Sequence, residues 1–452
     1  MNQFYKLSIF VTALLAAGWS TAQQQTPATF TLDQCIEYAF DNNPNLKNSK
    51  ISIEISRSKV RETVAGGLPQ ITGSGNLADN VIIPTSFLPA QVFGGPPGEF
   101  IGVKFGTQYS GTATLNFEQM LFNGSYFVGL KASRVYTELS RQDLISSKTD
   151  LIVAIKKAYY SVLVNSERLG YVNKNYSRLD SLLGQTKAMY SNGFAEKIDV
   201  SRVQVQFNNL INLKRNTELG LKISLNLLKF QMGFPMQNEI VLSDKLDDIK
   251  IQVLDNESPK SSYNDRVEFR KLDVNQQLLS LDIKNTKSQY LPRLDLYGNY
   301  GISYGTSDIG QFLEFGSRWK SLATIGLRAN ISIFDGLRKS NQIQQKKIQW
   351  DQIENTKVLL KNQIDMEQDQ TNLSYRSNIQ ALSGQKENLD LAEEVYKVSV
   401  IKYQQGVGSS IEVINADASF KEAQTNYYSA LYDALISSVD FDKAFGKIPT
   451  SK

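Results

Sequence analysis

The chain has 452 residues, 41% of them hydrophobic and 21% charged, which is the composition of a globular protein long enough to bury a large core. Its net charge of +4 is small for this length and gives no argument for a nucleic-acid partner. There is no histidine, and the single cysteine, Cys35, permits neither an intrachain disulfide nor a cysteine-based zinc site, so no metal or cofactor is expected and an enzyme is disfavoured.

Residues 1–22 have the features of a secretory signal peptide. Lys6 precedes an apolar run over residues 7–17, and the small residues Ser20 and Ala22 follow it, so cleavage is expected after Ala22. The alternative, a membrane anchor helix, is disfavoured because the run is short and three glutamines follow at once. No later stretch has eighteen consecutive apolar residues, so we expect an exported protein whose mature chain has no transmembrane helix.

Residues 23–233 are predicted to form the first copy of a structural plan. Its expected elements are, in chain order, a helix, a strand over 68–77, a loop over 78–108, a strand over 109–122 and a helical hairpin over 124–231. Pro69 is expected to end the helix and open the strand. The loop is indicated by Pro84, Pro89 and the glycine- and proline-rich run over 94–98.

The same order of elements is predicted to recur after an equatorial connector over residues 234–265, which is charged and of mixed secondary structure. The second copy, 266–446, is expected to contain a helix, a strand over 291–304, a loop over 305–320, a strand over 321–334 and a helical hairpin over 336–445, followed by a short tail over 447–452. Three sequence landmarks recur in order: Leu68-Pro69-Gln70 as Leu291-Pro292-Arg293, Leu121-Phe122-Asn123-Gly124 as Ile333-Phe334-Asp335-Gly336, and the phrase that begins at Tyr190 as the phrase that begins at Tyr403.

The four predicted strands alternate apolar and polar residues. In the last strand the apolar residues occupy every odd position: Ala323, Ile325, Leu327, Ala329, Ile331 and Ile333. Such alternation also occurs in the sheet of a soluble protein, where one face packs on the core and the other is exposed to solvent. Two features favour a membrane instead: strands of about 10 residues match a tilted bilayer crossing, and aromatic residues lie near the strand ends. Because four strands in lipid would leave two unpaired edges, the membrane interpretation requires oligomerisation.

The remaining segments are predicted to be long helices. No proline occurs over 124–190 or 336–403, and each stretch would extend roughly 100 Å at 1.5 Å per residue. Asn-Gly and Asp-Gly pairs commonly form hairpin turns, but no strand pattern follows them here. We therefore expect Asn123 and Asp335 to cap the starts of the two long helices.

The chain resembles the TolC family of outer-membrane efflux proteins. The resemblance rests on the order of its parts: a signal peptide, then two copies of a strand pair followed by a long helical hairpin with a Tyr-x-x-Gly turn. The resemblance covers essentially the whole mature chain. It implies a membrane α+β fold in which a homotrimer forms a 12-stranded outer-membrane β-barrel, four strands from each chain, continued by a long periplasmic barrel of coiled-coil helices. The expected location is the outer membrane of a Gram-negative bacterium.

The resemblance also implies a function. Family members serve as passive exit ducts of tripartite efflux or type I secretion systems, docked by a periplasmic adaptor (membrane fusion) protein and an inner-membrane transporter that supplies the energy. The partners expected for this chain are therefore its own copies, the adaptor, the transporter and outer-membrane lipid. The cargo is not indicated, because a lining of serine, asparagine, glutamine and threonine accepts many solutes.

The repeated phrases would lie at the hairpin tips, at the periplasmic mouth. Gly193 and Gly406 can adopt the positive φ that a tight helix exit needs. By resemblance, Gly193, Phe194, Gly406 and Val407 are expected to contact the adaptor. The alternative is that each tip residue packs against its own neighbours.

The resemblance further places Asp199, Tyr403, Glu412 and Asn415 at a periplasmic gate. Carboxylates that face one another across a pore would raise one another's pKa and attract cations. The resemblance implies that Tyr403 donates a hydrogen bond to Asp199, and the alternative is that Tyr403 is simply a packing residue. The alternative is that Asp199 and Glu412 simply stabilise helix N-termini. Gly408 stands where the family has a latch arginine and Asn415 where it has a second luminal acid, so a weaker latch and weaker cation selectivity are expected.

Two other functions remain to be weighed. A secreted, soluble helical scaffold without a pore would explain the same helices and predicts a protein that is soluble without detergent. An exported hydrolase lacks support, because the sequence has no catalytic triad, metal-ligand spacing or phosphate-binding loop.

Overall fold

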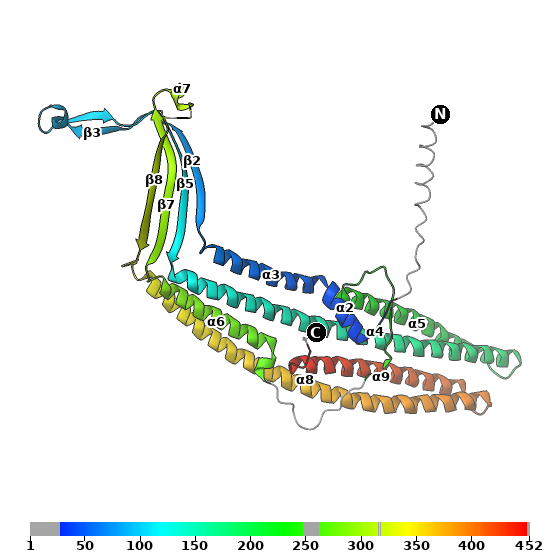
Figure 1. The fold of residues 1–452 in the computed structure, drawn as a ribbon. Helices are drawn as coiled ribbons and strands as arrows, with labels where there is room; N and C mark the ends of the chain where they lie inside the picture. The colour runs from blue at the N-terminus through cyan, green and yellow to red at the C-terminus, as the bar shows by residue number, and fades with distance from the viewer. Residues whose placement is uncertain (1–27, 247–248, 250–261, 315, 317, 450–452) are drawn as a thin grey trace, which may run out of the picture. The chain divides into compact units, whose positions relative to one another are not determined.

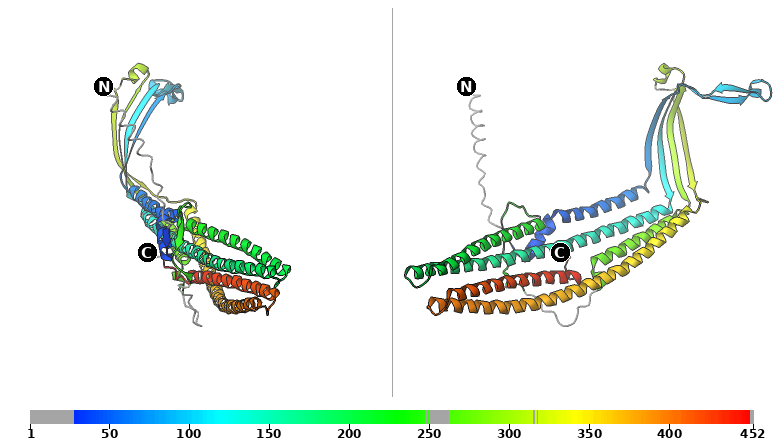
Figure 2. Two further views of the ribbon diagram at one scale, coloured as in Figure 1. Left: turned by 90° about the vertical axis from the view of Figure 1, so that its right-hand side faces the viewer. Right: turned by 180° about the vertical axis from the view of Figure 1, so that it is seen from behind.

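The structure is a computed structural model, and it describes residues 28–246, 249, 262–314, 316 and 318–449. The predicted signal peptide and parts of the connector and tail lie outside the described residues. The chain divides into two compact units. The first comprises Met1–Asn48, Ile145–Arg266 and Gln363–Lys452, and the second comprises Ser49–Leu144 and Val267–Asn362. Figures 1 and 2 show the ribbon from three sides.

The first predicted helix is in fact two helices, α2 (Leu32–Asn42) and α3 (Pro44–Ala65). Thr31 caps α2 in a capping box, in which its hydroxyl accepts from the Gln34 N–H at 3.3 Å and the Gln34 side chain accepts from the Thr31 N–H at 2.9 Å. The Asn43 side chain then accepts from the N–H of Leu46 at 3.1 Å. The prediction of one helix was wrong because Pro44 cannot donate the backbone hydrogen bond that continuation requires.

The second unit contains a four-stranded antiparallel sheet built from β2 (Gln70–Asp79), β5 (Tyr109–Phe122), β7 (Arg293–Thr306) and β8 (Lys320–Asn330). The strand order is β2-β5-β7-β8, so β2 and β8 are the edge strands. The last strand ends at Asn330, whereas the sequence predicted 334. Asn330 pairs with Arg293, and β7 offers no further partner because Pro292 precedes it.

The predicted loop 78–108 contains two short strands that were missed, β3 (Thr85–Pro89) and β4 (Phe100–Lys104), joined through a 3-10 turn at Ala90–Phe93. The prolines and glycines that indicated a loop lie mostly in its turn, where Gly94 and Gly98 have φ of 82° and 89°. The flanking aromatic and β-branched residues pair as strands. The second loop, 305–320, likewise contains a short helix, α7 (Ile309–Phe312), capped by Asp308.

The long helices are α4 (Gly124–Ser191), α5 (Lys197–Met232), α8 (Arg338–Gln404) and α9 (Ser410–Ala444). The Asn123 side chain accepts from the Ser125 N–H at 3.0 Å, which confirms its capping role. Helix α8 begins two residues later than predicted because Gly336 and Leu337 have left-handed φ of 64° and 65°. The Asp335 carboxylate still accepts from the Lys339 N–H at 3.2 Å. None of the described helices is long and apolar enough to cross a bilayer.

In the second unit, ion pairs attach α6 (Val267–Ser288) to its neighbours α4 and α8. Lys271 lies 2.7 Å from Asp143 of α4, and Lys357 of α8 lies 2.7 Å from Asp273. These pairs are partly exposed, so each contributes little to stability.

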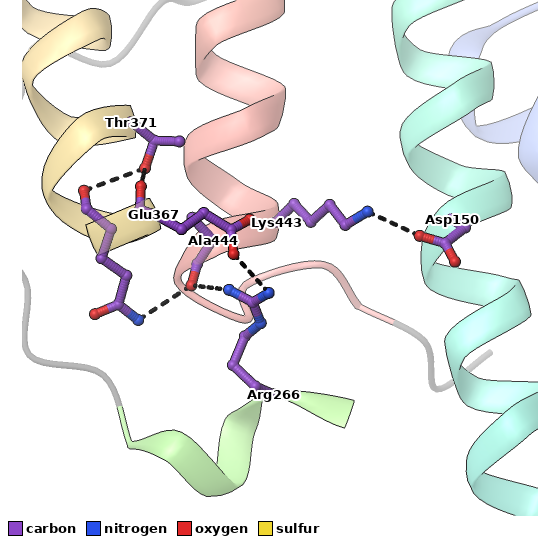
Figure 3. A network of polar contacts seen from close by, with 7 residues as sticks. Asp150, Arg266, Glu367, Thr371, Lys443 and Ala444 are labelled. Carbon is purple, nitrogen blue, oxygen red and sulfur yellow. Dashed lines mark hydrogen bonds and ion pairs between the residues drawn. The ribbon is translucent and has the colours of Figure 1, made fainter. Parts of the chain in front are cut away.

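The described parts of the connector join the first unit through backbone pairing and one buried arginine. A short strand that was not predicted, β1 (Ala28–Phe30), pairs in parallel with β6 (Ile240–Leu242). After a 3-10 turn at Tyr263–Asp265, Arg266 donates to the Ala444 carbonyl at 3.0 Å and to the Glu367 carboxylate at 2.9 Å (Figure 3). Arg266 thus satisfies a carbonyl that the end of α9 leaves without a helical partner.

Candidate functional site

The first tip, between α4 and α5, is a Schellman turn. The Phe194 N–H donates to the Met189 carbonyl at 2.8 Å and the Gly193 N–H donates to the Tyr190 carbonyl at 3.1 Å. This pattern needs a left-handed residue just past the helix, and Gly193 has φ of 79°. The glycine at +3 from the tyrosine is therefore explained by backbone geometry.

The second tip, between α8 and α9, repeats this geometry. The Val407 N–H donates to the Lys402 carbonyl and the Gly406 N–H to the Tyr403 carbonyl, each at 3.1 Å, and Gly406 has φ of 75°. Gly408 is packed against α8, since a Cβ there would lie 2.9 Å from the Cβ of Lys402. This close packing excludes a latch side chain at position 408.

The residue after each positive-φ glycine is apolar and points into solvent. In a Schellman turn this residue commonly packs on the last turn of its own helix. Here Phe194 is 80% exposed and Val407 77% exposed. The alternative that these side chains pack against their own neighbours therefore receives no support from the geometry.

Asp199 connects the two tips of the chain. Its carboxylate accepts from the Glu196 N–H at 3.1 Å, which caps α5, and also accepts from the hydroxyl of Ser410 at the start of α9. Arg202 lies 3.6 Å away. Asp199 thus serves as a helix cap, as the alternative proposed, and also as a tip-to-tip contact.

Tyr403 lies close to this contact but does not take part in it. Its side chain is buried, and its hydroxyl has no hydrogen-bond partner among the described residues, so the bond expected from Tyr403 to Asp199 is replaced by the bond from Ser410. The ring belongs to an apolar cluster in which α4, α5, α8 and α9 meet. Sequence reasoning missed Ser410, because a serine in the first turn of a helix is common and its partner is 211 positions away.

Glu412 and Asn415 are both exposed and lie three residues apart on α9, so they share one face of the helix. Their neighbour Val413 is buried in the cluster that joins the hairpins. The polar face of α9 near the tip therefore presents one carboxylate and one amide to the surroundings.

A second polar layer lies farther along the hairpins and was not predicted. The Arg178 guanidinium lies 5.6 Å from the ring centroid of Tyr396 and 5.5 Å from that of Phe420, and it donates to Asn175 at 2.7 Å. Asn175 in turn donates to Gln424 at 2.9 Å. Burial, with a smaller contribution from the nearby Asp417 carboxylate, raises the pKa of the Tyr396 phenol in this layer.

The sheet has one apolar and one polar face across all four strands. Paired residues share a face, and the register aligns Ile71 with Phe117, Leu115 with Tyr300, and Tyr300 with Ala323. The apolar side chains are open to the surroundings, with Ile71 71% and Ile325 79% exposed. A contiguous exposed apolar surface of this kind marks contact with a membrane or a partner.

The polar face carries charged residues at the end nearest the helices. Arg293 pairs with Glu118 at 3.3 Å and with the buried Asp295 at 2.8 Å. Arg328, which is opposite Asp295 in the register, lies 4.8 Å from the ring centroid of Tyr297. One face of the sheet is thus apolar, whereas the other carries polar and charged side chains.

Comparison with known proteins identifies the fold and the family. The sequence model described as "Outer membrane efflux protein" matches residues 35–233 and 260–447, one segment for each copy of the plan. The chain belongs to this family. It is an outer-membrane channel of the tripartite efflux and secretion systems of Gram-negative bacteria, in a family of channels rather than enzymes. The secreted scaffold without a pore is thereby excluded.

The relatives are distant in sequence and close in fold. The chain is 20% identical to outer membrane protein TolC of Vibrio cholerae over 75% of this chain and 77% of that protein. It is 21% identical to TolC of Salmonella enteritidis over 99% and 87%, respectively. The open-state structure of the MtrE outer membrane channel of Neisseria gonorrhoeae superposes with a TM-score of 0.69 at 14% identity, over 92% of this chain and 88% of that one. The family implies a trimeric channel that works with efflux partners.

Proposed function

We propose that three copies of this chain close a 12-stranded barrel, four strands each, by pairing β8 of one copy with β2 of the next. The observation that supports this most directly is the apolar face that runs across all four strands and ends at two unpaired edges. In hydrocarbon each unpaired backbone group costs several kcal/mol, and a closed ring removes that cost. The apolar face then contacts lipid and the polar face lines a water-filled lumen.

The long hairpins then form the periplasmic tunnel, with two tips from each copy at its mouth. The matching backbone of the two tips supports a nearly sixfold ring, since three copies would supply six similar turns. Phe194 and Val407 are the exposed apolar side chains that a periplasmic adaptor would bury, next to Gly193 and Gly406. This mode of docking explains why apolar side chains remain exposed on both turns.

The gate at the mouth is proposed to consist of Asp199, Tyr403, Glu412 and Asn415, together with Ser410. The Asp199–Ser410 bond holds the two tips of one chain together and so favours the closed mouth. Glu412 supplies a ring of three carboxylates that attract cations, and the neutral Asn415 keeps that attraction modest.

Transport through the duct is passive, and an inner-membrane transporter supplies the energy. This function is tested by purifying the mature chain from outer-membrane fractions and recording its mass in detergent. We expect a trimer that runs as a heat-modifiable species and forms conducting channels in planar bilayers. A monodisperse single subunit in plain buffer would refute the proposal.

A further inference from the structure

The loop between β7 and β8, residues 307–319, lies at the end of the sheet farthest from the long helices (Figure 1). We term it the α7 loop. Although it joins β7 to β8, it also packs on β5: the ring centroid of Phe312 lies 6.0 Å from that of Tyr109. The ring centroid of Trp319 lies 5.9 Å from that of Tyr304 on β7. Both loop rings are buried, so the loop is seated on the two inner strands of the sheet.

The contacts around Gly111 of β5 show which face of the sheet the α7 loop covers. Gly111 pairs with Leu77 of β2 and with Tyr304 of β7, and it shares its side of β5 with Leu115, so all four positions belong to the apolar face. A Cβ at Gly111 would lie 2.5 Å from the Trp319 ring. The missing side chain at position 111 therefore provides the space in which the loop packs on the apolar face.

The α7 loop holds two apolar side chains outward. Ile309 and Leu313 are 50% and 67% exposed, and their spacing of four residues places them on one side of the short helix. The Leu313 N–H donates to the Ile309 carbonyl at 3.2 Å, and the Asp308 carboxylate accepts from the Gly310 N–H at 2.9 Å. The exposed apolar surface is thus part of an ordered turn that is fixed to the sheet by buried rings.

The charged residues of the α7 loop are compatible with a position beside lipid. Only three occur between positions 307 and 319. Asp308 caps the helix, and Glu314 and Arg318 lie 3.3 Å apart as an ion pair. An element that combines outward apolar side chains with a few charged groups is suited to the boundary between acyl chains and headgroups.

We propose that the α7 loop binds the outer leaflet of the membrane, with Ile309 and Leu313 among the acyl chains just below the headgroups. This inference rests on the proposed function, in which the apolar face of the sheet contacts lipid. Lipid is the favoured occupant because the loop lies on that same face and extends its apolar surface. The rings of Tyr109, Tyr304 and Trp319 then lie at the interface, where aromatic residues gather in outer-membrane barrels.

Two other occupants are less consistent with the geometry. The hairpin of β3 and β4 starts close by, where the Asn80 N–H donates to the Gln108 carbonyl at 2.6 Å, yet Ile309 and Leu313 remain exposed in its presence. A neighbouring copy would pair with the edge strands β2 and β8, whereas the α7 loop packs on the inner strands β5 and β7. Neither protein surface is therefore placed to cover the two side chains.

Lipid contact is tested with a fluorescent label on single cysteines. The buried native cysteine is first removed by Cys35→Ser. Leu313→Cys is then labelled with an environment-sensitive fluorophore, and the protein is placed in phosphatidylcholine vesicles with or without bromine atoms on the acyl chains. We expect blue-shifted emission that brominated lipid quenches, most strongly when the bromines are close to the headgroups. Ile325→Cys on the apolar face is the positive control, and Thr324→Cys on the polar face is the negative control.

The outcomes separate the lipid contact of the loop from the proposed function. If the label at Ile325→Cys is quenched and the label at Leu313→Cys is not, the loop does not bind lipid, but the barrel remains supported. Blue-shifted emission at Leu313→Cys without quenching would show that protein covers the loop, which also overturns the inference. If the label at Ile325→Cys is not quenched, the apolar face does not contact lipid and the proposed function itself is wrong.

A pair of glycine variants tests whether the packing on the sheet positions the loop. Gly111→Ala introduces a methyl group against the Trp319 ring and should reduce the quenching of the label at Leu313→Cys by lipid brominated near the headgroups. Gly73→Ala is the matched control on the same face, because its Cβ would make an ordinary contact, 3.6 Å from the Leu115 side chain. Equal quenching in the two variants would show that the space at Gly111 does not position the loop in the membrane.

Discussion

The sheet and the helix tips obtain their properties in different ways. The sheet depends on a repeated pattern, in which many apolar side chains share one face and a ladder of backbone hydrogen bonds fixes the register. The tips depend on a few individual contacts, such as the bond between Asp199 and Ser410, and on two exposed side chains, Phe194 and Val407. A single residue should therefore matter more at the tips, except where a change reverses the pattern of the sheet.

The largest effect should come from a charge on the apolar face. Ile325→Arg should destabilise the assembled barrel by about 2–4 kcal/mol per chain, because the charge would face lipid. The fraction of the protein recovered as trimer from outer membranes measures this loss. Thr324→Arg, one residue away on the polar face, is the matched control and should assemble normally. Equal defects in the two variants would contradict the assignment of the faces.

The next largest effect should come from breaking the contact between the tips. Ser410→Ala leaves Asp199 without its partner on α9, and a hydrogen bond to a charged group contributes about 1.5–3 kcal/mol. We expect a higher open probability in single-channel recordings. Ser201→Ala is the control, because the Ser201 hydroxyl donates within its own helix, to the Lys197 carbonyl. Asp199→Asn keeps an oxygen that can accept from the Ser410 hydroxyl. If the hydrogen bond matters more than the charge of Asp199, this variant should raise the open probability less than Ser410→Ala does.

The two tips should contribute unequally to docking, although their backbones match. Phe194→Ala removes more exposed apolar area than Val407→Ala, and buried apolar area contributes about 25 cal/mol per Å². Efflux in cells that contain the complete system should therefore fall more for Phe194→Ala, with both proteins present as trimers at wild-type levels. Wild-type efflux in both variants would exclude these side chains from the docking surface.

The smallest effect should be on ion selectivity. Glu412→Gln should lower the preference for cations, and Asn415→Asp on the same helix face should raise it, because each changes the charge near the mouth by one unit per chain. Reversal potentials in planar bilayers under a salt gradient measure both changes. If neither variant shifts the reversal potential, these positions do not line the pore.

Much of the fold could be predicted because its signals are local. Alternation specified the four long strands, and the proline-free stretches specified α4 and α8. The tip glycines were recognisable because a positive φ favours one residue type. The hairpin of β3 and β4 was missed because its strands are short and its turn is rich in proline and glycine, so the signal for a loop outweighed the signal for strands.

The site was predicted less completely, because its contacts join residues that are far apart in the chain. Asp199 was identified, but its partner was expected to be Tyr403 and is Ser410. The layer around Arg178 combines residues from α4, α8 and α9, and none of them forms a motif by itself.

The sequence by itself determined the duplicated plan, the two-sided chemistry of the strands and the turns that close the hairpins, since each depends on the periodicity or conformational preference of neighbouring residues. Only the tertiary structure decided the strand order, which side chains meet between the tips and which apolar residues remain exposed. These features depend on how distant segments pack, and hydrogen bonds and burial between distant segments leave no local pattern in a single sequence.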